Sequence, residues 1–214
     1  MRRHLLAVSL IAAAATAMGA GTIDASSGVF DESIYLRLGR EVFATGRAPD
    51  FWCYGIAPLP VVLAYSTPVL GQLTAYPAAI VAARWTALLL FGVPVLVLIY
   101  GWLAARQGRA LATAAALFVA LSPTFFAHAS LATTDTAAVA SSLLVLVVLE
   151  RTLDRPSRRR LAWLTLSLGV AFAAKYSAIA LTPVIAAALV LATPRRTTTW
   201  SAHLVAVAQA GTLT

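Results

Sequence analysis

The sequence predicts an all-α protein that crosses a membrane several times. Of its 214 residues, 60% are hydrophobic and only 11% are charged, whereas soluble domains carry about 25% charged residues. The mean hydropathy of +0.84 agrees with this interpretation. Short arginine clusters separate the apolar runs, which is the positive-inside pattern of a multi-pass protein. We expect a single membrane domain over residues 1–214 with about six or seven transmembrane helices, some of them short.

The composition excludes several classes of partner. The formal net charge is +8, and only one of the sixteen cations, Lys175, is a lysine. A nucleic-acid partner requires a basic face in water. These arginines lie between apolar runs, so we expect membrane lipids around the protein and no nucleic acid. The single cysteine, Cys53, excludes an internal disulfide and a cysteine metal cluster. Metal ligands do not recur at a recognisable spacing, so the sequence supports no metal cofactor and leaves a divalent cation open.

The chain opens with Arg2, Arg3 and His4, followed by the apolar run LLAVSLIAAAATAMGAG. This run has the length of a transmembrane helix, about 18–20 residues. A signal peptide has the same order of charges, apolar core and small residues. We favour the uncleaved helix because the rest of the chain is also apolar. Either interpretation places the residues after 24 outside the plasma (inner) membrane, and the uncleaved helix leaves the N-terminus in the cytoplasm.

Residues 24–57 form the predicted first outer loop, which holds most of the acidic residues of the chain: Asp24, Asp31, Glu32, Glu41 and Asp50. Within it, 32–44 reads as an amphipathic juxtamembrane helix that lies along the membrane surface. Arg37 and Glu41 are spaced to form an ion pair on this helix. Its apolar positions recur at helical spacing at Ile34, Tyr35, Leu38 and Val42.

The later apolar runs predict further helices. Strong spans cover 76–103, 110–127 with an interruption at Ser122-Pro123, and 135–149. Run 61–70 is too short to cross a membrane. Two other runs, 161–174 and 177–193, flank Lys175-Tyr176, and 200–214 resembles the start of another helix.

Arginine clusters predict the topology, because all of them belong on the cytoplasmic side. The chain must therefore turn outward in each gap between clusters, within 24–57, within 122–134 and at 175–176. Helices that fail to reach the outer face would leave a polar recess there. The clusters are Arg2 with Arg3, Arg106 with Arg109, Arg151 with Arg155, Arg158, Arg159 and Arg160, and Arg195 with Arg196.

Asp135 is the only acidic residue between Arg109 and Glu150. A carboxylate in so apolar a run is costly, which makes it a functional candidate. Capping of the fourth helix is its structural alternative. Lys175 requires a partner, either a carboxylate or a ligand phosphate. His128, seven residues before Asp135, either belongs to the same site or lies at the membrane interface.

Asp31 and Glu32 follow the first span, with Tyr35 one helical turn later. In a structural role, Asp31 would cap the helix over 32–44 and Glu32 would stabilise its first turn. In a functional role, the two carboxylates would take part in the reaction. Arg84 lies roughly 12 Å inside the second span. In a structural role, its side chain extends to the membrane interface or pairs with a residue of a neighbouring helix. In a functional role, it binds an anion such as phosphate.

In these elements the chain resembles the N-terminal part of the multi-pass glycosyltransferases that use polyprenyl-phosphate sugars, with a GT-C-like helical bundle. The protein O-mannosyltransferase group and its relatives, including lipid A aminoarabinose transferases, are the most similar. The matching pieces are Phe30-Asp31-Glu32 with Tyr35, Ala57-Pro58-Leu59-Pro60, Ala83-Arg84, Ser122-Pro123, His128-Ala129-Ser130, Thr134-Asp135 and Ala174-Lys175-Tyr176-Ser177. Leu59 departs from the family's usual Pro-Pro pair, and family members are longer, so we expect residues 1–214 to be the N-terminal part of a longer module.

The resemblance implies an inverting transfer of a sugar from a polyprenyl-phosphate donor to a hydroxyl of a glycan, lipid or protein at the outer face. It implies catalytic roles for Asp31 and Glu32, with Asp31 acting as the general base on the acceptor hydroxyl or helping to position that hydroxyl. The implied substrate-binding residues are Tyr35, Arg84, His128, Asp135, Lys175 and Tyr176. A transporter or channel subunit and a non-catalytic scaffold are the alternatives. The acidic outer loop and the lack of a visible inverted repeat favour the enzyme.

Overall fold

A computed structural model describes residues 2–24 and 27–192, and every regular element in these ranges is helical. The predicted helix over 200–214 and the Arg195-Arg196 cluster lie outside the described residues. The elements are α1 (Arg2–Ile23), α2 (Phe30–Thr45), η1 (Phe51–Tyr54), α3 (Pro58–Leu70), α4 (Tyr76–Ala87), η2 (Leu88–Gly92), α5 (Val93–Ala104), α6 (Arg109–Ala120), α7 (Pro123–Ala129), α8 (Thr134–Asp154), α9 (Arg158–Ala174), η3 (Tyr176–Ala180) and α10 (Leu181–Ala192).

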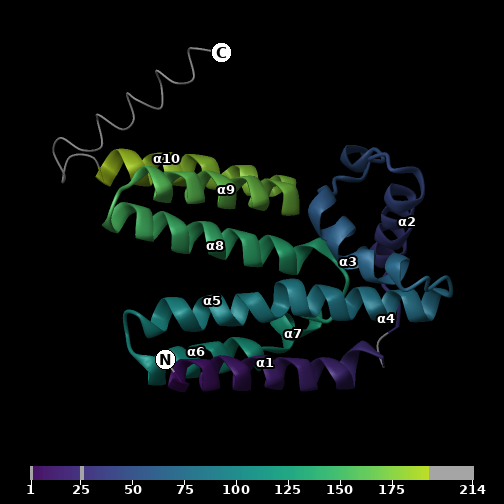
Figure 1. Cartoon of the computed structure of the whole chain (residues 1–214), viewed down its shortest axis with the longest axis horizontal. Helices are drawn as coiled ribbons and strands as arrows, with labels where there is room; N and C mark the ends of the chain where they lie inside the picture. Colours follow the sequence, from purple (N-terminus) through teal and green to yellow (C-terminus); the bar gives the residue numbers. More distant parts are fainter. Residues whose placement is uncertain (1, 25–26, 193–214) are drawn as a thin grey trace, which may run out of the picture.

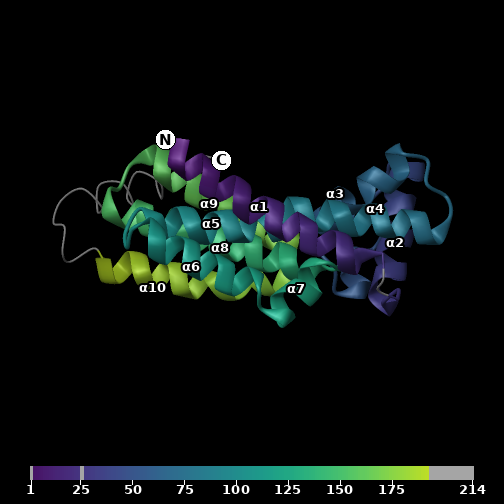
Figure 2. The same ribbon diagram turned by 90° about the horizontal axis from the view of Figure 1, so that it is seen from below.

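The long helices run side by side along the long axis of the molecule (Figure 1). Helix α5 packs against α6, α8 against α9, and α1 against both α5 and α6. Helices α2, α3 and α4 gather at one end, and the turned view places them at the same end (Figure 2). The start of α1 and the α5–α6 and α8–α9 turns lie at the other end (Figure 1). The arginine clusters on these two turns therefore share one end of the bundle.

Among the residues that the structure describes, three helical rods are long and apolar enough to cross a membrane: Leu6–Ile23, Tyr76–Ala104 and Thr134–Asp154. Helices α6 and α7, which meet at a bend of 68°, make a fourth if they count as one broken span. The predicted total of six or seven is therefore not confirmed. The physical reason is length, because the apolar helix α3 has 13 residues and rises only about 20 Å at 1.5 Å per residue.

The second span is one rod made of α4, η2 and α5, and it confirms the helix predicted over 76–103. Its middle turn, Leu88–Gly92, is π-helical. Pro94 lies two residues after this turn and has no N–H to donate to the carbonyl of Leu90, so the regular α-helical bond is missing there. A local π-helical turn accommodates this loss without ending the helix.

Helix α2 confirms the amphipathic helix predicted in the outer loop. It buries Tyr35, Leu36 and Leu38 against the end of the bundle. The predicted Arg37–Glu41 ion pair is wrong. Arg37 instead donates a hydrogen bond of 2.9 Å to the hydroxyl of Tyr54 and lies 5.6 Å from the centre of its ring.

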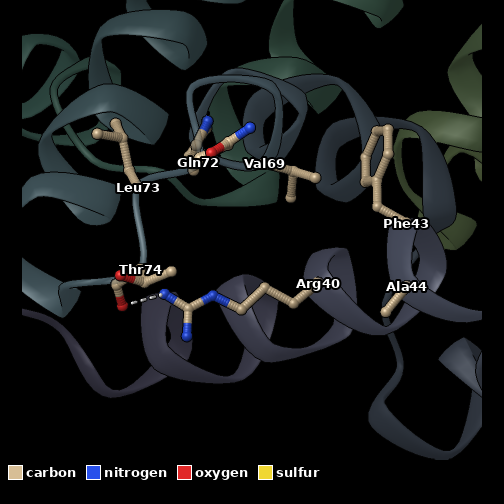
Figure 3. Close-up of a pocket in the computed structure, with 8 residues that line it drawn as sticks. Arg40, Phe43, Ala44, Val69, Gln72, Leu73 and Thr74 are labelled. Atoms are coloured by element: carbon tan, nitrogen blue, oxygen red, sulfur yellow. Dashed lines mark hydrogen bonds between the residues drawn. The ribbon is translucent and has the colours of Figure 1, made fainter.

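The far half of α2 faces the turn between α3 and α4. Arg40 donates a hydrogen bond of 3.0 Å to the carbonyl of Thr74 across a cavity of about 310 Å³ (Figure 3). Gly39 lies where α2 meets α3, and a Cβ atom there would lie 2.6 Å from Cβ of Tyr65. Only glycine allows the two helices to approach this closely.

Candidate functional site

Asp135, Lys175 and His128 meet where α7, α8 and α9 end or begin. The Nζ atom of Lys175 bonds Oδ1 of Asp135, and Nδ1 of His128 lies 3.7 Å from Oδ2 of the same carboxylate. The Asp135 and Lys175 side chains are 46% and 35% exposed, so the pair is open to a ligand. Asp135 does not cap α8, because Thr133 holds the N-cap position and Asp135 lies in the first turn.

The local backbone explains how Lys175 reaches Asp135. Lys175 directly follows α9 and has an extended conformation, with φ of −158° and ψ of 130°. The helix therefore stops at Ala174, and a helix of the 3₁₀ type starts at Tyr176. This break lies at the predicted outward turning point and brings the lysine to the start of α8.

A cavity of about 410 Å³ opens beside this cluster, under the bend between α6 and α7. His128, Asp135 and Thr136 line it on the side of the cluster, and Thr136 also donates a hydrogen bond of 2.9 Å to the carbonyl of His128. Ser122, Thr124, Phe125 and Val139 complete its wall. The recess thus has Asp135, one member of the ion pair, in its wall, and Lys175 lies next to it.

Tyr35 connects the outer loop to this cluster. Burial raises the pKa of its hydroxyl, a hydrogen bond with Thr134 opposes that rise, and the negative charges of Asp31 and Asp135 add to it. Both carboxylates therefore act on the same phenol, although they are more than 100 residues apart in the sequence. Asp31 is exposed in the first turn of α2. Its predicted capping role is wrong, because Val29 holds the N-cap position.

Tyr176, the residue after Lys175, contacts the outer loop. Its ring centre lies 5.1 Å from that of Trp52 in η1, and the two ring planes are inclined by 57°. Trp52 was not singled out from the sequence. A tryptophan within a polar loop is the sequence signal that would have found it, and its side chain is 74% exposed.

Glu32 and Arg84 form a separate, fully buried ion pair. Oε2 and Oε1 of Glu32 accept hydrogen bonds of 2.7 Å and 2.8 Å from Nη2 and Nε of Arg84. Arg84 also donates to the carbonyls of Ile23 at 2.9 Å and Ser27 at 2.8 Å. The side chains are 0% and 1% exposed. This pair ties α1, α2 and α4 together, and its guanidinium faces protein groups rather than an open phosphate site.

The same pair fixes the loop that precedes Asp135. Oε1 of Glu32 accepts a hydrogen bond of 2.9 Å from the N–H of Ala132, and the hydroxyl of Tyr65 donates one of 2.7 Å to the carbonyl of Ala132. Burial alone would raise the pKa of Glu32, but the hydrogen bonds from Arg84, Val29 and Ala132 outweigh it and lower the pKa. Sequence reasoning missed Tyr65, because a tyrosine in an apolar helix carries no distinguishing local signal.

Within residues 2–24 and 27–192, no three histidine, cysteine, aspartate or glutamate side chains gather as metal ligands would. The model of one protein family, dolichyl-phosphate-mannose-protein mannosyltransferase, matches residues 60–213, well over half of the chain. The chain belongs to this family. No curated protein and no solved structure matches it.

As a member of this mannosyltransferase family, the chain is a membrane glycosyltransferase. This favours the enzyme over the transporter and scaffold alternatives. The match includes Arg84, His128, Asp135 and the Lys175-Tyr176 pair, whereas Asp31, Glu32 and Tyr35 precede it. The bonds of Glu32 with Arg84 and Ala132 and the contact of Trp52 with Tyr176 link the acidic outer loop to the matched segment.

Proposed function

We propose that this protein transfers a sugar from a polyprenyl-phosphate donor to an acceptor hydroxyl at the outer membrane face, with inversion at the anomeric carbon. Mannose is the sugar that the description of the family names. The observation that supports this most is the partly exposed ion pair of Asp135 with Lys175 beside a cavity of about 410 Å³. The negative charges of Asp31 and Asp135 both act on the phenol of Tyr35. General base and leaving-group stabiliser are the two functions that such a transfer requires.

Asp31 is the proposed general base. Its carboxylate takes the proton of the acceptor hydroxyl while that oxygen forms a bond to the anomeric carbon. The bond from the anomeric carbon to the phosphate oxygen breaks at the same time, and the phosphate leaves with the electron pair. Attack from the face opposite the leaving group inverts the anomeric centre. Asp31 suits this role because it is exposed in the first turn of α2, where no other side chain of the described residues bonds it.

Lys175 is the proposed partner of the departing phosphate. Its ammonium group is 35% exposed and lies next to the cavity that Asp135 and His128 line. A lysine held by one carboxylate retains further N–H donors for a phosphate oxygen. Asp135 then positions the lysine, and His128 contributes a second group to the same wall.

Tyr176 and Trp52 are the proposed contacts to the sugar or the acceptor. Their rings pack together on the outer-loop side of Lys175, and Trp52 remains largely exposed. Aromatic rings offer a flat apolar face together with a polar edge, which suits a sugar ring. Tyr35, which bonds Thr134 at the start of α8, is assigned to the floor of the site.

Glu32 and Arg84 are assigned to positioning rather than to substrate contact. Their charged groups are buried and bond each other and the backbone of three segments. They act on the reaction through the Ala132 loop, which sets the start of α8. In this proposal the active site faces the outer side of the membrane, and the arginine-rich turns lie in the cytoplasm.

A transfer assay on membranes that contain this chain tests the assignment of the base. The donor is a polyprenyl-phosphate mannose with a labelled sugar, and label is counted separately in protein, lipid and glycan fractions. We expect Asp31→Asn to abolish transfer, because the amide cannot take the proton. Asp24→Asn is the matched control, since this exposed aspartate precedes α2 in the same loop and should retain transfer. Equal transfer by Asp31→Asn and wild type would contradict the assignment, and no label in any wild-type fraction would contradict the reaction.

A further inference from the structure

A second cavity, of about 410 Å³, lies at the end of the bundle opposite the proposed active site. It opens at the turn between α8 and α9, at the left-hand end of the molecule (Figure 1). Arg151, Ser157, Arg159, Arg160 and Trp163 contribute to its lining, together with Val148. None of these residues takes part in the site around Asp135.

One arginine of this cavity is used to build the turn. Arg160 donates from Nη1 to the carbonyls of Arg151 and Arg155, which are exposed where α8 ends. The N–H of Arg160 donates a hydrogen bond of 3.2 Å to the hydroxyl of Ser157, which caps α9. These bonds satisfy groups that a helix end leaves open, so the shape of the cavity is fixed by the protein itself.

Two other arginines of the cavity lack a counter-charge. Arg151 and Arg159 are exposed, and within residues 2–24 and 27–192 neither lies within ion-pair distance of a carboxylate. The last acidic residues of the sequence, Glu150 and Asp154, are already engaged by Arg106 at 2.6 Å and 3.5 Å. The cavity therefore carries two unneutralised guanidinium groups beside the N-terminus of a helix, which itself favours an anion.

Two residues of the cavity lining, Val148 and Trp163, are apolar. Trp163 is 52% exposed and Val148 is partly exposed. Leu166, on the same side of α9 three residues further, is 56% exposed. Tryptophan side chains prefer the boundary between lipid headgroups and acyl chains. A ligand that places an anion on the arginines and a hydrocarbon chain along α9 would match both halves of this surface.

We infer that the cavity between Arg151, Arg159 and Trp163 is a binding site for the phosphate group of an anionic phospholipid of the membrane leaflet at this end of the bundle. The guanidinium groups match phosphate oxygens in geometry and charge. Basic pockets at this boundary bind lipid headgroups in membrane proteins generally. The site is separate from the proposed transfer reaction, so it does not depend on the identity of the donor.

The test uses the whole chain purified in a mild detergent, with phosphatidylglycerol as the anionic probe and phosphatidylcholine as the neutral one. Native mass spectrometry counts the lipids that stay bound. We expect Arg151→Gln with Arg159→Gln to bind phosphatidylglycerol about 30-fold more weakly than wild type, since each arginine near a membrane surface contributes about 1 kcal/mol. Arg109→Gln with Arg158→Gln removes the same charge at the same end but outside the cavity, and should bind as wild type.

Three outcomes would overturn the inference. An equal loss in both double variants would show diffuse attraction to positive charge and no site. No loss in Arg151→Gln with Arg159→Gln would exclude these arginines. Displacement of the lipid by inorganic phosphate at similar concentrations would show a site for free phosphate. Arg151→Lys with Arg159→Lys keeps the charge but lacks the two-pronged geometry of the guanidinium group, so we expect binding between that of wild type and that of the glutamine variant. Thermal unfolding of each variant establishes that it is folded.

Discussion

Nη2 of Arg84 lies 2.7 Å from Oε2 of Glu32, and neither side chain is more than 1% exposed. A buried charge without its partner is far more costly than a buried pair. We therefore expect Arg84→Gln to lower the free energy of unfolding by about 3–5 kcal/mol. Thermal or denaturant unfolding in detergent measures this loss.

Arg106→Gln is the matched control for this prediction. Arg106 also pairs with a glutamate, Glu150, at 2.6 Å, but its side chain is 34% exposed. A partly exposed pair contributes about 1 kcal/mol or less. Equal destabilisation by Arg84→Gln and Arg106→Gln would contradict the structural role of the buried pair.

The same pair predicts a dependence of stability on pH. The folded-state pKa of Glu32 is lowered from its ordinary value of 4.5. Its contribution to stability is therefore present above the unfolded-state pKa and is lost as the pH falls through the folded-state pKa. We expect Glu32→Gln to flatten the acid side of the stability profile, measured by unfolding between neutral pH and the acid limit. An unchanged acid slope in this variant would contradict the prediction.

Gly39 predicts a steric effect where α2 meets α3. A Cβ atom at this position would lie 2.6 Å from Cβ of Tyr65, on the rigid part of that side chain. We expect Gly39→Ala to destabilise the protein by about 1–3 kcal/mol. Gly101→Ala in α5 is the control, because nothing lies within 4 Å of its added Cβ, so it should be neutral or stabilising. The same sign for both variants in an unfolding experiment would show that the contact is not tight.

Asp135 and Lys175 predict non-additive losses of sugar transfer. Because each side chain is partly exposed, removal of either charge should change stability by no more than about 1 kcal/mol. Transfer should fall strongly in Asp135→Asn and in Lys175→Gln. The double variant should lose no more than the more severe single variant, since the two groups act as one unit. Losses that add in the double-mutant cycle would show independent roles.

Cys53 tests the side of the membrane on which the first loop lies. It is the only cysteine of the sequence and is exposed. A maleimide that cannot cross membranes should label it in intact cells if the loop is outside. Gln107→Cys in a Cys53→Ser background is the control, because Gln107 is exposed in the α5–α6 turn and should resist labelling until the membrane is opened. The reverse labelling pattern would invert the proposed topology.

Asp50 should slow this labelling reaction. Sγ of Cys53 donates a hydrogen bond of 2.9 Å to Oδ2 of Asp50, and this bond with the negative charge of Asp50 raises the pKa of the thiol. A raised pKa leaves less thiolate, which is the reactive form. We expect Asp50→Asn to react faster with the maleimide at neutral pH. An unchanged rate would contradict the contact.

Much of the fold is predictable because it depends on local patterns. The span over 76–103 and the amphipathic helix over 32–44 were predicted from hydropathy and helical spacing, and both are present with nearly the same bounds. The interruption at Ser122-Pro123 is present as the bend between α6 and α7. The predicted number of membrane-crossing helices is not confirmed within residues 2–24 and 27–192, because hydropathy identifies apolar runs and not their lengths as folded helices.

The candidate site is less predictable because its partners are distant in the chain. Asp135 and Lys175 were selected as isolated charges in apolar runs, and Asp31 as an acidic residue of the first outer loop. The sequence left more than one role open for Asp135 and Asp31. The separation of Asp31 from Glu32, one exposed and the other buried, has no counterpart in the sequence, since the two residues are neighbours.

The sequence by itself determined that this protein is a helical membrane protein, which end of each helix carries the arginines, and which charges are costly enough to require partners. Hydropathy and charge spacing are local properties, so they can be read from the sequence without knowledge of how the helices pack. Only the tertiary structure decided the partners: Arg84 with Glu32 across 52 positions, and Lys175 with Asp135 across 40. A charge in an apolar setting requires neutralisation, but which opposite charge lies within reach depends on how the helices pack.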